Sequence, residues 1–407
     1  MLIIQANNHN VIRGGSETVF HETSDLLTKG GHEVIKLHFG VRSIDHRGRR
    51  YRFYGSNTNW VSKAIMLFTG RFIFDYLNYW NYVRFFNEVK PDILHVHIFY
   101  GWLSNAIILA AHRCGVPVVM SNHEYRWTCP VYTHVDTKGE ICNACVDSSW
   151  NSVWKRCNKG NLILSLANLI EILCRDHVFK TADKIDGIVM VSDFIKDHTG
   201  RAKPKFLSKS VVLNNFVAKP DGFVEACDRS RSELVFFGRI SREKGLTTLL
   251  QAMSKFDDVT LNVVGGGDLD LLNGAGKNVV VHGKMPREEL MHLVGRCAFS
   301  VIPSEWYENN PMSLIESLGL GVPVIGARIG GIPEMINHGQ TGYLFESGSV
   351  EGLEQVISEA MSLPESTYAE MCSAALKYFE SNYLEAKHYE RLLTIYRQHA
   401  KNRTIHG

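Results

Sequence analysis

Two glutamates, Glu308 and Glu316, stand eight positions apart on either side of Pro311 in the stretch SEWYENNPMSLIESLGLGVP. Proline suits the first position of a helix, and Asn309 or Asn310 suits its cap, so Glu308 should lie at a helix mouth. Glu316 should lie about 1.5 turns inside that helix, at ~3.6 residues per turn. Carboxylates accept two hydrogen bonds and therefore bind the vicinal hydroxyls of sugars well. A loop carboxylate and a surface helix carboxylate are the simpler alternative.

Two further segments carry groups that bind anions. In HNVIRGGSETVF, Gly14 and Gly15 follow an apolar run and open a helical pattern, where backbone N–H groups and the positive helix end attract phosphate. In VFFGRISREKGLTTLL, Arg239 and Lys244 stand in a loop before a helix and suit a diphosphate. A tight turn and a solvated basic loop are the respective alternatives.

A third glycine segment, VVGGGDLDLL, invites comparison with dinucleotide-binding loops. It lacks the third glycine of the GxGxxG pattern and lies well inside the second half of the chain. We therefore expect a strand-to-helix turn here and no nicotinamide cofactor.

Four cysteines fall within 29 residues, in WTCPVYTHVDTKGEICNACVDSSWNSVWKRC. The inner pair is separated by two residues, a spacing typical of structural zinc and iron–sulfur sites. Disulfides are rare in cytoplasmic proteins, which leaves metal ligands or ordinary thiols as the two interpretations. We expect a structural zinc or iron–sulfur group, because four thiolates leave no open coordination position. The expected ligands are Cys129, Cys142, Cys145 and Cys157.

The bulk composition is that of an ordinary globular protein, with 45% hydrophobic and 21% charged residues among 407. A net charge of +2 gives no indication of nucleic-acid binding. Positive charge is nevertheless concentrated in residues 41–90, where nine Lys/Arg outnumber three Asp/Glu and thirteen aromatic residues are interleaved. This basic aromatic stretch favours contact with an anionic membrane surface, with a pair of helices that cover a sheet as the alternative.

The beginning of the chain, MLIIQANNHNV, lacks the basic and long apolar regions of a signal peptide. No run reaches the ~18 uncharged apolar residues that would span a bilayer. We therefore expect a cytoplasmic protein that lies peripherally on the inner face of the cell membrane.

These groups need elements that bring them together. Short apolar runs alternate with amphipathic helical patterns, which predicts an α/β fold with parallel sheets between helices. The pattern restarts near residue 210, so we expect two Rossmann-like domains that face each other across a cleft. The expected divisions are 1–210, with a Cys-rich insertion at about 125–160, then 211–375, and a helical segment 376–407 that packs back on the first domain.

Four ordered motifs now reveal a resemblance that covers most of the chain. FFGRISREKGLTTLL, NVVVHGKM, SVIPSEWYENNPMSLIESLGLGVPVIG and GGIPEMINHGQTGYLF resemble the retaining glycosyltransferases of family 4, which have the GT-B fold. The segments RGGSE and SNHE match as well, whereas residues 40–90 and 130–175 are the least similar. The family often has Glu-Gly-Phe-Gly where this chain has ENNP, so the resemblance does not extend to the identity of the sugar.

The resemblance implies a role for each motif residue. Arg239 and Lys244 would hold the donor diphosphate, Glu308 the sugar hydroxyls and Glu316 the ribose. His123 would lie near the anomeric centre, which completes the catalytic set of Glu308, His123, Arg239 and Lys244. The remaining donor-binding residues are Gly14, Gly15, Lys284, Met285, Asn309, Asn310, Pro311, Met312 and Ser313.

The implied reaction is transfer of a sugar from a nucleotide-diphosphate sugar to a saccharide or lipid-linked glycan, in surface polysaccharide biosynthesis. Arg239, Lys244 and a helix N-terminus would stabilise the leaving phosphate, so catalysis needs no metal and no other cofactor. Two alternatives stay open. One is another enzyme of the same architecture, such as a sugar-nucleotide 2-epimerase or a phosphorylase, and the other is a catalytically inactive glycan-binding subunit.

Overall fold

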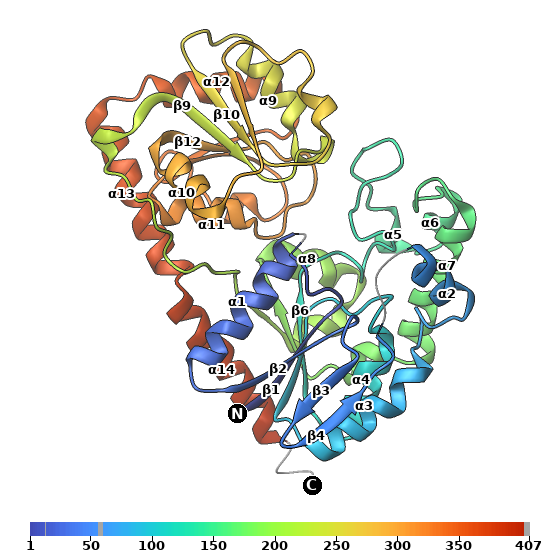
Figure 1. Cartoon of the computed structure of the whole chain (residues 1–407). Coiled ribbons are helices and arrows are strands. Elements are labelled where there is room, and N and C mark those ends of the chain that lie inside the picture. The colour runs from blue at the N-terminus through green and yellow to red at the C-terminus, as the bar shows by residue number, and fades with distance from the viewer. Residues whose placement is uncertain (13, 56–59, 403–407) are drawn as a thin grey trace. The chain divides into compact units, whose positions relative to one another are not determined.

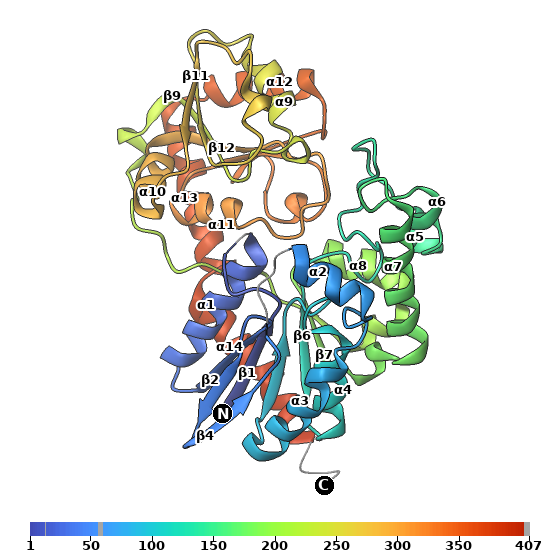
Figure 2. The same cartoon turned by 45° about the vertical axis from the view of Figure 1, so that its right-hand side comes forward.

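The computed structural model describes residues 1–12, 14–55 and 60–402, and the chain divides into two compact units (Figure 1, Figure 2). Unit 1 comprises residues 1–191, 195–213 and the chain from Tyr389 onward, and unit 2 comprises residues 192–194 and 214–388. Three parts of the predictions lie outside the described residues: Arg13 of the RGGSE motif, 56–59 of the basic aromatic stretch, and 403–407 of the C-terminal segment.

Unit 1 is built on a parallel sheet of six strands in the order β2-β1-β5-β6-β7-β8. Its inner strands are almost continuous apolar runs, because a parallel sheet is covered by helices on both faces. The strands are β1 (Leu2–Asn7), β2 (Glu33–His38), β5 (Ile93–Val96), β6 (Val118–Asn122), β7 (Gly187–Met190) and β8 (Ser210–Val212). A separate antiparallel hairpin joins β3 (Ser43–His46) to β4 (Arg49–Arg52).

Helices surround this sheet, and one of them comes from the far end of the chain. From Tyr389 onward, α14 belongs to unit 1, and its Tyr396 hydroxyl accepts a hydrogen bond of 3.1 Å from Gln5 Nε2 of β1. The α-helices are α1 (Gly15–Lys29), α2 (Trp60–Phe68), α3 (Tyr76–Val89), α4 (Ser104–Arg113), α5 (Ala144–Asp147), α6 (Asn151–Trp154), α7 (Leu162–Leu173), α8 (Asp193–Ala202) and α14 (Glu385–Asn402). A π-helix, η1 (Cys174–Val178), continues α7, and the short 3-10 turns are η2 (Thr181–Lys184) and η3 (Pro204–Lys209).

Unit 2 repeats this design with a second parallel sheet of six strands, in the order β11-β10-β9-β12-β13-β14. The strands are β9 (Ser230–Phe237), β10 (Thr260–Val264), β11 (Val279–Gly283), β12 (Cys297–Ile302), β13 (Val324–Ala327) and β14 (Gly342–Phe345). The helices are α9 (Leu246–Met253), α10 (Arg287–Arg296), α11 (Met312–Gly319), α12 (Val350–Met361) and α13 (Glu365–Asn382). Short 3-10 turns are η4 (Ala226–Asp228), η5 (Arg242–Lys244), η6 (Leu269–Leu272) and η7 (Ile332–Glu334).

The core of unit 2 fixes where its strands end. Leu234 of β9, Leu261 of β10 and Ile325 of β13 are fully buried with the apolar faces of α9 and α11. Complete burial of such side chains stabilises the fold by about 1.5–3 kcal/mol each. Because all six strands are parallel, this core also brings the loops that follow the strands to one edge of the sheet.

Each sheet has a point at which the strand order reverses. In unit 2 the chain runs outward from β9 through β10 to β11, then returns to β12 on the other side of β9. In unit 1 the reversal lies between β1 and β5. Loops diverge at such a point, and ligands of open α/β sheets bind in the crevice that this leaves at the carboxyl ends of the strands.

The fold confirms the predicted α/β class with two Rossmann-like parallel sheets. Residues 376–388, which we had assigned to the segment that packs on the first domain, lie instead in unit 2, because α13 packs on α11 there. Helix α11 begins at Met312, so Pro311 occupies the cap position and no side chain caps the helix. Among the described residues, no helix combines the length and the apolar character needed to cross a bilayer.

Candidate donor-binding site

An ion pair joins the two loops that flank the reversal point of unit 2. Lys244 follows β9 and Glu308 follows β12, the neighbouring strand, and Lys244 Nζ lies 2.5 Å from Glu308 Oε1. Glu308 is buried and Lys244 is mostly covered. Two of the residues that the sequence singled out, 64 positions apart, are therefore in direct contact.

The surroundings of Glu308 keep its carboxyl group ionised. Burial alone would raise its pKa, but Lys244 and hydrogen bonds from Trp306 and Ser304 outweigh burial and lower the pKa below the usual value. The Trp306 indole N–H and the Ser304 hydroxyl each donate to Glu308 Oε1 at 2.8 Å. All three donors thus bind Oε1, and among the described residues none donates to Oε2. That oxygen is left as an acceptor for a ligand hydroxyl.

Glycines make this arrangement sterically possible. Gly245 adopts a left-handed conformation (φ 71°), and a Cβ there would lie 1.8 Å from the carbonyl oxygen of Pro303. Gly331 donates its backbone N–H to the carbonyl of Glu308 at 2.7 Å, and a Cβ on Gly330 would lie 2.2 Å from the same carbonyl oxygen. The motifs REKG and GGIPE therefore support the ion pair by letting backbone approach backbone.

Arg239 is placed differently from Lys244. Its guanidinium is exposed, donates to Glu243 Oε1 at 2.8 Å, and lies 5.9 Å from the centre of the Trp306 ring. The Lys244 ammonium lies 5.3 Å from the same ring. Both cations therefore border Trp306, but only Lys244 is tied down by a buried carboxylate. Arg239 keeps the freedom to turn toward an anion.

Glu316 lies within α11, as the proline suggested, and it has a partner that the sequence analysis missed. Arg287, the first residue of α10, donates to Glu316 Oε1. Glu316 is buried, and burial raises its pKa although Arg287 acts in the opposite direction. The only signal in the sequence was an arginine after a helix-starting proline, which is too common a pattern to have predicted this pair.

Other predicted donor-binding residues lie in three places in unit 2. The side chain of Asn310 is buried and accepts the backbone N–H of Asn215 at 2.9 Å, so it holds the loop in place. Met312 and Ser313 form the first turn of α11, where backbone N–H groups have no acceptor within the helix. Lys284 and Met285 follow β11, and the Lys284 side chain lies over Gly266.

In unit 1, the partly buried His123 belongs to a chain of hydrogen-bonded polar side chains. His123 Nε2 lies 2.9 Å from His97 Nδ1, and His97 Nε2 lies 2.8 Å from Gln5 Oε1. Burial lowers the pKa of His123 to about 4, so the ring is neutral at pH 7. The sequence analysis missed His97, although the alternation in HVHI places His95 and His97 on one side of the strand.

Glu124, which the sequence analysis did not single out, follows His123 at the end of β6. Burial raises its pKa to about 7, with a further contribution from Glu17 of α1 and an opposing one from Arg126. Gly14, the cap of α1, has extended backbone, and Gly15 begins the helix. A carboxyl group that titrates near neutral pH at the end of a central strand is a candidate for acid–base or hydrogen-bonding work.

The four cysteines of the insertion lie close enough to interact electrostatically. Burial, together with the neighbouring thiols of Cys129, Cys157 and Cys142, raises the pKa of the Cys145 thiol to about 12. All four are free thiols. Among the described residues, however, no group of three or more His, Cys, Asp or Glu side chains is arranged to hold a metal ion. The donor set therefore fits a metal only in part.

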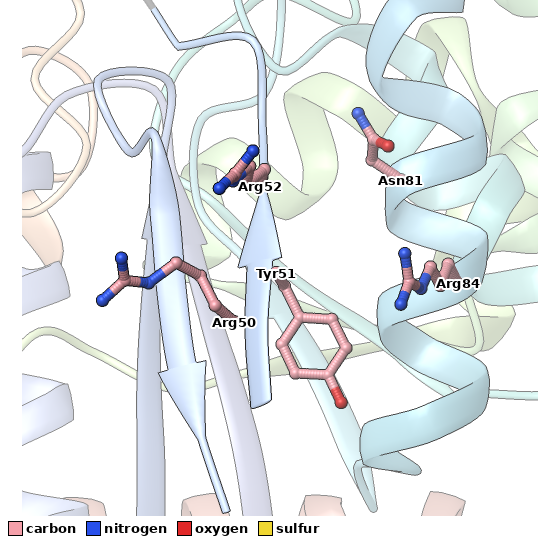
Figure 3. A pocket seen from close by; sticks show the side chains of 5 residues that line it. All are labelled: Arg50, Tyr51, Arg52, Asn81 and Arg84. Carbon is pink, nitrogen blue, oxygen red and sulfur yellow. The ribbon is translucent and has the colours of Figure 1, made fainter. Parts of the chain in front are cut away.

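A separate pocket of about 300 Å³ lies between the β3–β4 hairpin and α3 (Figure 3). Arg84 ion-pairs with Glu88, Arg50 ion-pairs with Asp45, and Arg52 has no ion pair among the described residues. Since neighbouring carboxylates already neutralise two of its three arginines, we assign it no part in catalysis. The lining residues are Arg50, Tyr51, Arg52, Asn81 and Arg84.

Comparisons with known proteins show the family of the chain. Residues 13–218 match the family described as Glycosyltransferase Family 4, and residues 223–377 match that described as glycosyl transferases group 1. The sulfoquinovosyl transferase SQD2 of Arabidopsis thaliana is 27% identical over 269 residues, which are 64% of this chain and 48% of that protein. The chain thus spans about half the length of this curated relative.

Solved structures share the fold over nearly the whole chain. A glycosyltransferase from Rickettsia africae ESF-5 has a TM-score of 0.68 at 17% identity, covering 98% of this chain and 99% of that one. Anabaena Alr3699/HepE in complex with UDP-glucose has a TM-score of 0.62 at 15% identity, covering 99% of both chains. At such identities the likeness concerns the fold.

The buried ion pair leads to a prediction about stability. Lys244→Met should lower the free energy of unfolding by about 3 kcal/mol, because it leaves the Glu308 carboxylate buried without its counter-charge. Glu308→Gln in the same background should recover at least half of that loss, since the amide needs no cation. Urea unfolding of the wild type, both single variants and the double variant measures the coupling. A loss below about 0.5 kcal/mol for Lys244→Met would show that the pair is not buried in solution.

Glu124 leads to a prediction about pH. Its folded-state pKa is raised, so its contribution to stability is fully present below about pH 4.5 and is lost as the pH rises through about 7. Glu124→Gln should match the wild type at pH 5 and exceed it at pH 8.5, by on the order of 2 kcal/mol. Chemical unfolding at the two pH values tests this, with the exposed Glu225→Gln as control. Equal differences at both pH values would refute the raised pKa.

Proposed function

The chain belongs to glycosyltransferase family 4, and from that premise we propose that it is a retaining enzyme dependent on a nucleotide-diphosphate sugar. The observation that carries the proposal is the Lys244–Glu308 pair at the reversal point of unit 2, with Arg239 beside it. It supplies cations for a diphosphate and one uncommitted carboxylate oxygen for a sugar hydroxyl. Binding of a diphosphate sugar would use the cations and the carboxylate oxygen together.

In this proposal the cations stabilise the leaving group. As the glycosidic bond breaks, negative charge develops on the departing phosphate oxygen, and we assign its stabilisation to Arg239, Lys244 and the first turn of α11. Preorganised charges of this kind need no metal ion, and we propose that catalysis uses none. The departing phosphate is also the base that we propose for the acceptor hydroxyl.

The two glutamates serve different parts of the donor in this proposal. Glu308 is ionised and therefore accepts hydrogen bonds only, which suits the hydroxyls of the transferred sugar. Glu316 is assigned to the ribose, where Arg287 holds its carboxylate in position. Lys284 and Met285 are assigned to the base. The neutral ring of His123 is assigned to the anomeric region, as a hydrogen-bonding group without charge.

The donor class has support from a protein of the same fold, Anabaena Alr3699/HepE, whose structure contains UDP-glucose. For the acceptor we propose a saccharide or a lipid-linked glycan in surface polysaccharide biosynthesis. Such an acceptor is presented at a membrane, so we propose a peripheral location on its inner face. The basic aromatic stretch, residues 41–90, is consistent with that location.

Substitution of the exposed Arg239 should affect catalysis without affecting stability. Arg239→Ala should lower kcat/KM by at least about a hundredfold, roughly 2.7 kcal/mol of transition-state stabilisation. Its stability should stay unchanged, because an exposed pair four residues apart contributes only about 0.3–0.5 kcal/mol. Release of nucleoside diphosphate from a panel of UDP-, GDP- and ADP-sugars measures the rate.

Arg242→Ala is the matched control, because Arg242 is an exposed cation of the same loop with no ion pair among the described residues. It should change kcat/KM by less than about threefold. Equal effects of the two substitutions would mean that only the net charge of the loop matters. Unchanged turnover by Arg239→Ala would contradict the assigned role.

The structural metal remains a proposal of the sequence analysis, distinct from catalysis. Purified protein should carry about one zinc ion, or the iron of one cluster, per chain. Cys142→Ser combined with Cys145→Ser should remove it and lower the stability of unit 1, whereas Cys227→Ser, at an exposed cysteine of unit 2, should not. Elemental analysis decides, and less than about half an equivalent in the wild type counts against a filled site.

A further inference from the structure

An apolar face on unit 1 has no role in the site described above. The outward side of α7 and the neighbouring α6 segment expose large hydrophobic side chains, which we call the α6–α7 face. Trp154 is 80% exposed and Ile163 is 71% exposed, values rare for side chains of this size. The face consists of Trp150, Trp154, Leu162, Ile163, Leu166 and Ile170.

Helix α7 has no exposed charge at all. The usual surface helix shows a polar outer side, whereas the one ionisable residue of α7, Glu171, is buried. Its carboxylate pairs inward with Arg175 at 3.4 Å and with Arg126 at 3.5 Å. The side chain of Asn161 caps the helix start by accepting the N–H of Leu164. A well-defined helix thus presents an apolar side outward, while its only charge faces the protein.

Cations stand directly beside this face. Three exposed cations lie between α6 and α7: Lys155, Arg156 and Lys159. From Ser148 to Ile170 the chain contains these three cations and no aspartate or glutamate. Apolar side chains, indoles and cations together are the composition of a helix that lies in the interface of an anionic membrane.

A second helix of the same kind lies on the same side of unit 1. In α2, Trp60 is 79% exposed and Phe68 is 95% exposed, and Lys63 is the only charged residue. Figure 1 and Figure 2 both show α2 near α7. From residue 46 to residue 74 the chain again contains no aspartate or glutamate. The helix α2 thus adds exposed apolar side chains to this side of unit 1 without adding an aspartate or glutamate.

We propose that the α6–α7 face and α2 form a docking surface for an anionic phospholipid bilayer. The aliphatic side chains enter the acyl boundary, the indoles lie at the level of the headgroups, and the cations bind lipid phosphates. With 12 residues, α7 is too short to span a bilayer and lies in the plane of the surface. This inference deepens the proposed function, because it assigns the membrane contact to named residues.

Charge favours a bilayer over a second copy of the chain. A two-fold contact sets the same patch against itself, so Arg156 and Lys159 of both copies would share one interface. Neither segment contains a carboxylate that could neutralise them. An anionic lipid surface supplies that missing negative charge and covers the apolar side chains at the same time.

Flotation with vesicles tests the inference on the full chain. Wild-type protein should float with phosphatidylcholine vesicles that contain 30% phosphatidylglycerol, at least tenfold more than with phosphatidylcholine alone. Raising the salt concentration should weaken this preference, because the lipid charge is then screened. Failure of the wild type to float with either vesicle would overturn the proposal.

Two variants separate the apolar from the charged contribution. Ile163→Asp with Leu166→Asp should lower binding to anionic vesicles at least tenfold, and Arg156→Gln with Lys159→Gln should lower the preference for anionic lipid. Leu269→Asp changes an equally apolar side chain, 55% exposed in unit 2, and should leave binding unchanged. Trp154→Ser, at an exposed position, provides a second apolar test if the aspartate variant does not fold.

Sedimentation and turnover complete the design. Wild-type binding retained by Ile163→Asp with Leu166→Asp would overturn the proposal, as would a wild-type dimer that this variant dissociates. Nucleoside diphosphate release is measured without vesicles and should be the same in the wild type and in this variant. A protein that releases nucleotide but does not bind vesicles refutes the docking surface alone, whereas one that binds vesicles but turns over no donor refutes the proposed function alone.

Discussion

The contact between Lys244 and Glu308 is the constraint on which the proposed donor site depends. A buried carboxylate is costly unless a cation and hydrogen bonds compensate for its lost hydration, and Glu308 has both on a single oxygen. The same compensation keeps the group ionised and leaves its other oxygen as an acceptor. Gly245 and Gly330 allow the backbone to approach closely enough for the pair to form. The same contact therefore compensates for the burial of Glu308 and is central to the donor site that we propose.

The two parallel sheets explain why the polar and charged side chains of the candidate site lie at the carboxyl ends of strands. In each sheet the strand order reverses at one point, so the loops that follow the two strands on either side of it run in opposite directions. The side chains of these loops therefore stay accessible. Unit 2 places cations and carboxylates there, with Arg239 exposed and Lys244 fixed. In unit 1 the neutral ring of His123 and the carboxyl group of Glu124 follow β6, one strand beyond the reversal point between β1 and β5. The charged groups suit a diphosphate, and the weakly charged groups suit hydroxyls.

Some parts of unit 1 that lie away from the strand ends expose apolar side chains instead of charged ones. Residues 40–90 and 130–175, which the sequence analysis found least similar to the family, contain α2, α7 and three of the four cysteines of the insertion. In α7 the one charged residue, Glu171, is buried and bound to two arginines, whereas the exposed side of the helix is apolar. Surface helices usually show polar residues on their exposed side, so this apolar side agrees with the docking surface that we propose.

The amino-acid sequence by itself determined the α/β class and the second series of alternating strands and helices that starts near residue 210. It also determined that Lys244 and Glu308 lie in loops after strands and that Glu316 lies within a helix. These follow from local periodicity and turn chemistry, which act over a few residues. Tertiary structure alone decided that Arg287 meets Glu316, that His97 meets His123, and that residues 376–388 stay with unit 2. It also decided that Glu171 faces inward while Ile163 faces solvent. Each of these depends on which distant segments pack together, because burial and charge pairing arise between residues that no local pattern connects.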